Sequence, residues 1–148
     1  MVAAAGSAMA GVSVTYVAPE NYVDMPWQDR ERQRILDDLS GHFSKLAQQL
    51  PAGQDLSIEV LDIDLAGQLK PVRWAMQDMR VITGGADWPH ITLRYTVTQN
   101  GQVVKQGEER VQNMNYTRRT NRYFTSETLR YEKQMLDDWF GQRIVAAR

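Results

Sequence analysis

The strongest constraint on how this chain can fold is a β-hairpin signal in residues 91–111. Apolar residues alternate with polar ones along its first arm, at Ile91, Leu93, Tyr95 and Val97. A period of two gives a strand one apolar face and one polar face. Asn100 and Gly101 come next, and both tolerate the positive φ angles of a two-residue type I′ turn. The sequence therefore predicts that residues 103–111 return antiparallel, which describes how the chain is built and names no activity.

Two amphipathic helices are predicted, one on each side of the strand-rich middle. The first begins at Asp29 and ends before Pro51 and Gly53. Its apolar residues recur at spacings of four and three: Ile35, Leu39, Phe43, Leu46 and Leu50. Gly41 lies inside it at a cost near ~1 kcal/mol relative to Ala, which suggests close packing against a strand. The second helix is expected to open at Ser126 and Glu127. Its apolar stripe consists of Leu129, Met135, Leu136, Trp139, Phe140 and Ile144.

Further strands are expected at residues 12–17 and 56–65. In the second of these, the apolar residues change from even to odd positions at Val60 and Leu61. A regular strand cannot keep both sets on one face, so we expect a β-bulge there, the alternative being a central strand partly covered on both sides. Residues 66–78 are interpreted as a loop that contains several large apolar residues, and residues 79–82 as a short strand.

The order of these elements, β-α-β-β-β-β-α, predicts an α+β fold. The most economical arrangement is a two-layer sandwich in which a mixed, mostly antiparallel β-sheet carries both helices on one face. The first two strands would pair in parallel through the first helix, and the open face of the sheet would carry Thr and Arg side chains.

Length and composition fit one domain with a full core. The chain has 148 residues, of which 43% are hydrophobic and 24% charged, close to the averages for globular proteins. The formal net charge of −1 supplies no global field for nucleic acid, so we expect no nucleic-acid partner. The absence of cysteine excludes disulfides, thiolate zinc sites and a cysteine nucleophile. No cofactor is indicated.

The first ten residues are interpreted as a partial signal peptide or a disordered leader, and residues 11–148 as a single α+β domain. Val2 to Ala10 is small and apolar, and Ala8, Met9 and Ala10 match an A-x-A cleavage pattern, although a basic n-region is missing. No later segment approaches the ~18 apolar residues that span a bilayer, so we expect a protein that is not integral to a membrane.

Carboxylates and histidines are the first candidates for chemistry. Asp62, Asp64 and Asp87 are oxygen ligands of the type that Ca²⁺ or Mg²⁺ prefers, but their spacing matches no metal loop, and a solvated strand edge is the simpler interpretation. His42 and His90 are the two histidines, and neither belongs to a recognisable catalytic motif. We therefore expect no catalytic residue and no metal site, with the three aspartates as weak candidates.

Recognition is predicted to involve aromatic and basic side chains. Trp74 in the predicted loop and Trp88 before Pro89 are large apolar groups outside the helices. A local basic patch contains Arg118, Arg119 and Arg122, which could grip an anion or simply pair with neighbouring acids. The full set of candidate binding residues is Trp74, Asp87, Trp88, His90, Arg94, Arg118, Arg119 and Arg122.

Five segments taken in order resemble an uncharacterised bacterial family, domain of unknown function 3016. They are VTYVAPENYVD, LSIEVLDIDLAG, GGADWPHITLRY, GEERVQNMNY and LRYEKQMLDDWF, and the similarity runs nearly end to end. The resemblance implies export to the periplasm of Gram-negative bacteria, with a cleaved signal peptide. It supplies no catalytic residues that could be transferred to this chain.

Three functions are weighed on these grounds. The first is a soluble, non-catalytic periplasmic module that binds another envelope component through a sheet edge or the Trp74 loop, and that could form a homodimer. The second is a metal-dependent hydrolase that uses Asp62, Asp64, Asp87 and His90. The third is a carrier of a small apolar or anionic ligand, held between the helices and the sheet and near Arg94. The sequence does not identify the partner or ligand, the oligomeric state or a lipid anchor.

Overall fold

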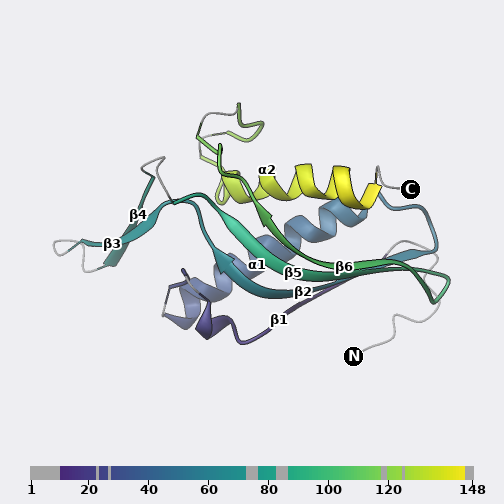
Figure 1. Cartoon of the computed structure of the whole chain (residues 1–148). Helices are drawn as coiled ribbons and strands as arrows, with labels where there is room; N and C mark the ends of the chain where they lie inside the picture. The colour runs from purple at the N-terminus through teal and green to yellow at the C-terminus, as the bar shows by residue number, and fades with distance from the viewer. Residues whose placement is uncertain are drawn as a thin grey trace.

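The computed structural model describes residues 11–22, 24–26, 28–72, 77–82, 87–117, 120–124 and 126–145, with the backbone alone for 68–72 and 77–79. A four-stranded sheet forms the body (Figure 1). Its strands lie in the order β1 (Gly11–Tyr16), β2 (Gln54–Asp64), β5 (His90–Gln99) and β6 (Gln102–Gln112). β1 pairs with β2 in parallel and the other neighbours are antiparallel, as predicted.

Both helices cover one face of this sheet (Figure 1). α1 (Asp29–Ala47) follows a short 3-10 turn, η1 (Pro19–Asn21), and connects β1 to β2. α2 (Arg130–Trp139) runs directly into a π-helix, η3 (Phe140–Val145). The two-layer α+β sandwich predicted from the sequence is therefore confirmed.

The core lies between the helices and the sheet. Phe43 of α1, Phe140 of η3 and Leu93 of β5 are fully buried in it. The opposite face of the sheet is polar, with Arg94 exposed and Thr92 and Thr96 half-buried. The alternation that predicted β5 thus separates the core from solvent.

Two local predictions in the sheet are confirmed. The register between β2 and β5 shifts between Val60 and Asp62, which is the predicted bulge. At the tip of the hairpin, Asn100 and Gly101 have φ angles of 52° and 88°, as a type I′ turn requires.

The prediction of a loop over residues 66–78 is wrong. β3 (Gln68–Val72) pairs antiparallel with β4 (Gln77–Val81), and the two form a separate small sheet. Pro71 suggested a loop, but each strand of a two-stranded ribbon has a free edge where a residue without an N–H is tolerated. The short strand expected at 79–82 overlaps β4, which begins earlier and ends at Val81. Trp74 lies outside the described residues.

Two details of the helices also differ from the predictions. The second helix begins at Arg130 instead of at Ser126, because Leu129 adopts a left-handed conformation with φ 56°. Gly41 does not pack against a strand, since a Cβ built on it would meet no atom within 4 Å. In the described part of the chain, no helix is both long enough and apolar enough to cross a membrane.

Candidate functional site

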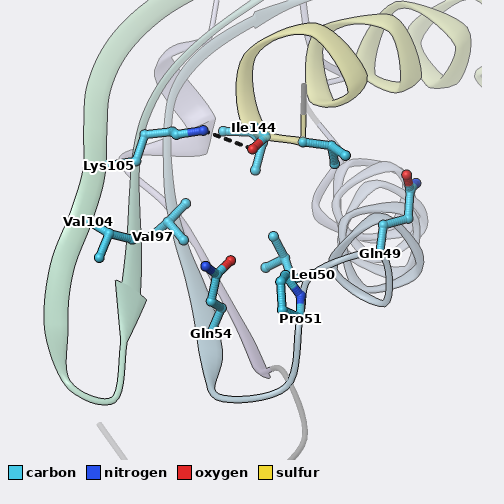
Figure 2. A pocket seen from close by; sticks show the side chains of 9 residues that line it. Gln49, Leu50, Pro51, Gln54, Val97, Val104, Lys105 and Ile144 are labelled. Carbon is cyan, nitrogen blue, oxygen red and sulfur yellow. Dashed lines mark hydrogen bonds between the residues drawn. The ribbon is translucent and has the colours of Figure 1, made fainter. Parts of the chain in front are cut away.

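An apolar hollow, here called the end pocket, opens at the hairpin end of the sandwich (Figure 2). It has a volume of about 290 Å³. Its lining comes from the end of α1, the start of β2, the tip of the β5–β6 hairpin and η3: Gln49, Leu50, Pro51, Gln54, Val97, Val104, Lys105, Ile144 and Val145. Residues distant in the sequence therefore build one cavity.

Local features of the sequence shape the walls of the end pocket. Pro51 follows the last turn of α1 and turns the chain toward β2. Val97 and Ile144 are buried in the core behind the pocket, whereas Val104 is about half exposed at its rim. The β5–β6 register shifts between Val97 and Thr98, so Val104 has no partner in the ladder there.

The cation of the end pocket is held by the protein itself. Lys105 Nζ donates to the carbonyl oxygen of Ile144 at 2.9 Å (Figure 2). It also donates to the carbonyl oxygen of Arg143 at 3.4 Å, at the end of η3. A cation at the C-terminal end of a helix satisfies carbonyls that have no partner within the helix. The remaining polar groups of the wall are the amides of Gln49 and Gln54, so the pocket favours an uncharged, mainly apolar group.

A second, polar hollow, here called the helix cleft, lies between α1, residues 122–124 with Glu127, and α2. It has a volume of about 420 Å³ and is lined by Asp37, Asp38, Gly41, His42, Lys45, Arg122, Tyr123, Phe124, Glu127 and Lys133. The buried ring of His42 contacts Asp137, with Nε2 2.7 Å from Oδ1, and Tyr123 donates to the other carboxylate oxygen at 2.6 Å.

Hydrogen bonds favour the charged forms of two residues at the helix cleft, Asp137 and Lys133. Burial opposes ionisation of Asp137, but the hydrogen bonds from His42 and Tyr123 outweigh it and hold the pKa of this carboxyl below its ordinary value. The buried ammonium of Lys133 lies between the carboxylates of Asp38 and Glu127. Burial lowers the pKa of Lys133, yet these two partners more than compensate and raise it.

Two of the predicted site residues meet on the sheet. Asp64 and His90 are register partners, and Asp64 Oδ2 lies 3.8 Å from His90 Nδ1. Arg110 lies 3.3 Å from the same ring. Burial, followed by the charge of Arg110, lowers the pKa of His90, and burial raises the pKa of Asp64. Asp62 is half-buried and pairs with Thr92.

Asp87 has a structural contact of its own. Its carboxylate accepts a hydrogen bond of 2.6 Å from Tyr116, and its carbonyl oxygen accepts one from the N–H of Gly67. Asp87 and Tyr116 are both buried. Within the described residues, no three His, Asp or Glu side chains form a group that could hold a metal ion.

The other predicted binding residues are dispersed. Arg94 is exposed on the open face, 3.5 Å from Glu59 and 3.3 Å from Glu108. Arg122 lines the helix cleft and contacts Asp137 and Asp138. Trp88 is half-buried. Trp74, Arg118 and Arg119 lie outside the described residues.

Sequence reasoning considered a carrier of a small apolar or anionic ligand held between the helices and the sheet, but it named none of the residues that line the end pocket as binding residues. One available signal was the doublet Val103–Val104, which interrupts the alternation just after the turn and indicates exposed apolar groups. The role of His42 was also missed, because its partner Asp137 is 95 residues away in the sequence. The periodicity of the sequence does not predict contacts between residues so far apart in the chain.

Comparison with known families gives a match. A family model described as protein of unknown function (DUF3016) matches residues 10–142. The chain therefore belongs to the DUF3016 family. No curated protein and no solved structure matches it.

Proposed function

We propose that this protein is a non-catalytic binding module of the bacterial cell envelope, which takes a small, uncharged, mainly apolar ligand into the end pocket. The observation that carries the proposal is the apolar wall of Leu50, Pro51, Val97, Val104 and Ile144 around about 290 Å³. A dry cavity of about 150 Å³ holds benzene. The end pocket therefore has room for a group of about two rings. The amide of Gln49 and the amide oxygen of Gln54 can meet a polar end, since Gln54 Nε2 already donates to Gln99 Oε1 at 2.9 Å.

The end pocket is a better candidate for binding than the β6 edge of the sheet. β1 and β6 are the two edges of the main sheet. β6 carries Lys105 and Glu109 on the helix side, where they contact η3 and Trp139. Inward-pointing charges on an edge strand discourage the addition of another strand. A partner strand at β6 would also have to accommodate the unpaired Val104.

The end pocket can be tested with 2-naphthol, which is uncharged and has two rings and one hydroxyl. We expect methyl NMR signals of Val97, Val104 and Ile144 to shift on titration. A Kd between about 0.1 and 4 mM follows from about 0.3–0.5 kcal/mol for each of about eleven heavy atoms.

Val103 and Val104 provide a matched control for this titration. Their exposed fractions are 55% and 54%, but Val104 lines the end pocket and Val103 does not. Val104→Asp should weaken 2-naphthol binding at least tenfold, and Val103→Asp should leave it within twofold. Equal effects of the two substitutions, or no shift of the pocket methyl signals, would contradict the proposal.

The proposed compartment is the periplasm. It is supported by the small apolar run ending in Ala8-Met9-Ala10 and by what the family resemblance implies. Cleavage after Ala10 would leave Gly11 as the first residue. The nitrogen of Gly11 lies 2.9 Å from Asp55 Oδ1, so a new terminal ammonium would form a charge-assisted hydrogen bond there.

Fractionation of bacteria that express the complete natural gene tests the compartment. We expect the protein in the periplasmic fraction, with an intact mass that corresponds to a chain beginning at Gly11. A cytoplasmic protein that retains Met1 to Ala10 would refute export, and it would leave the end-pocket proposal to its own test.

A further inference from the structure

The helix cleft contains an oriented histidine, which the end pocket does not. His42 Nε2 faces two acceptors, Asp137 Oδ1 at 2.7 Å and the carbonyl oxygen of Lys133 at 3.2 Å. Nε2 must therefore carry a hydrogen and donate it. In the neutral ring, Nδ1 is then the acceptor nitrogen.

His42 lines the helix cleft, and 5% of its surface is exposed. Within the described part of the chain its Nδ1 has no hydrogen-bond partner. Among the described residues, Arg130 Nε is the buried side-chain nitrogen or oxygen that lacks a hydrogen-bond partner. Nδ1 of His42 also lacks a partner but is not such a buried atom, so it is not sealed inside the protein. Because His42 lines the cleft, Nδ1 can accept a hydrogen bond from a ligand.

The charges that line the helix cleft balance one another. Three acidic residues, Asp37, Asp38 and Glu127, face three basic ones, Lys45, Arg122 and Lys133. A balanced cleft gives no advantage to a ligand with a net charge. Separated charges of opposite sign instead complement a ligand whose own two charges are separated.

One stripe of residues along α1 sets the distance between a negative and a positive charge in the cleft. Asp37, Gly41 and Lys45 lie four residues apart and all line the cleft. Asp37 accepts a hydrogen bond from Gln33, and Lys45 forms no ion pair with the described residues. Eight residues of helix rise about 12 Å, and the absent side chain of Gly41 leaves the floor between the two charges bare.

We infer that the helix cleft binds a short peptide with free amino and carboxyl ends, about three residues long. Three extended residues span about 10 Å, close to the length of the stripe. Asp37 receives the ammonium, Lys45 receives the carboxylate, and His42 Nδ1 accepts a backbone N–H between them. This site is separate from the end pocket and does not depend on it.

The test is NMR of the imidazole nitrogens in the full chain, titrated with triglycine. The chain has two histidines, so His90 serves as an internal reference. We expect the Nδ1 signal of His42 to move and the signals of His90 to stay unchanged. Triglycine with an acetylated amino end and an amidated carboxyl end should bind about tenfold more weakly, since both terminal charges are removed.

Surface substitutions separate binding from folding. Asp37→Asn and Lys45→Gln should each weaken triglycine binding about three- to fivefold, as expected for exposed ion pairs. Arg34→Gln, an exposed change on the same helix outside the cleft, should have no effect. Val104→Asp in the end pocket should also leave triglycine binding unchanged.

Three results would overturn the inference. The first is an unchanged His42 signal in the presence of millimolar triglycine. The second is equal binding of the blocked and free peptides, and the third is binding of acetate as strong as that of triglycine. The last would indicate a simple anion site.

Discussion

At the scale of single residues, several buried groups carry charge or strong polarity in the interior of this protein. Glu132 is 2% exposed, and its carboxylate accepts a hydrogen bond of 2.6 Å from the N–H of Ala66. Burial raises the pKa of Glu132, while this hydrogen bond opposes the rise. The pair links α2 to the end of β2. An unpaired N–H at this point would cost about 1–3 kcal/mol.

His90 gives a pH prediction at this scale. Burial and Arg110 lower its pKa, so the unfolded chain takes up the proton first as the pH falls. Neutral His90 contributes its full stability above about pH 6.5, the ordinary pKa of histidine in the unfolded chain. This stability is lost as the pH falls from there toward the lower pKa of His90 in the folded protein. We expect urea unfolding to show that the stability advantage of the wild type over His90→Gln decreases between pH 7.5 and pH 5.

Arg110→Gln provides the control for the His90 prediction. Removing this charge should make the loss of stability at low pH smaller, because less of the pKa depression remains. A wild-type advantage over His90→Gln that stays constant or grows at low pH would show that His90 is not kept neutral by the fold.

At the scale of elements, the ends of strands and helices depend on backbone conformation. The β5–β6 turn places Gly101 at φ 88°, whereas Gly41 lies within α1. A Cβ at either position meets no atom within 4 Å, so the two glycines differ in backbone conformation and not in available space. Substitutions at these two glycines therefore measure the effect of backbone conformation alone.

Replacing these two glycines by alanine should have opposite effects. Gly41→Ala should raise the free energy of unfolding by about 0.5–1 kcal/mol, because Ala is the better helix former. Gly101→Ala should lower it by about 1 kcal/mol or more, because an L-residue is strained at positive φ. Denaturant unfolding measures both changes, and shifts in the same direction would refute this account.

The small β3–β4 sheet shows how an element is positioned by contacts outside itself. Arg80 of β4 makes two hydrogen bonds to Asp24, of 2.8 and 3.1 Å, and donates to the carbonyl oxygen of Ala66. Asp24 in turn bonds through its N–H to Ile63 of β2. The ribbon is thereby fastened to the main body by a charged pair.

At the scale of the whole molecule, one core joins both helices to the four-stranded sheet. Leu39 of α1, Leu93 of β5 and Leu136 of α2 are each fully buried in it. Tyr95 and Trp139 meet edge to face, with ring centroids 5.7 Å apart. Gly107 lies opposite Tyr95 and leaves room for its ring, since a Cβ there would lie 3.0 Å from the Tyr95 hydroxyl.

Truncation of Leu93 measures this shared core. Leu93→Ala should lower the free energy of unfolding by about 2–5 kcal/mol in urea, with an unchanged m value. Val103→Ala, at an exposed position of the neighbouring strand, should change it by less than about 0.5 kcal/mol. Similar losses from both substitutions would mean that the core does not extend through Leu93 as described.

Local signals in the sequence were sufficient for most of the fold. Alternation in residues 91–97, the Asn100–Gly101 turn and the phase change at Val60 each depend on neighbouring residues, and each matches the structure. The late start of α2 and the β3–β4 ribbon were missed. Leu129 takes a left-handed conformation that is unusual for Leu, and Pro71 lies in a two-stranded ribbon whose free edges tolerate a residue without an N–H.

By itself, the sequence determined most of the secondary structure and the two-layer class, because periodicity and turn chemistry act over a few residues. The tertiary structure alone decided which side chains share a cavity. The end pocket joins Leu50, Val97 and Ile144, and the helix cleft joins His42 to Asp137. These contacts follow from how the layers pack around one core, and no local pattern in the sequence predicts them.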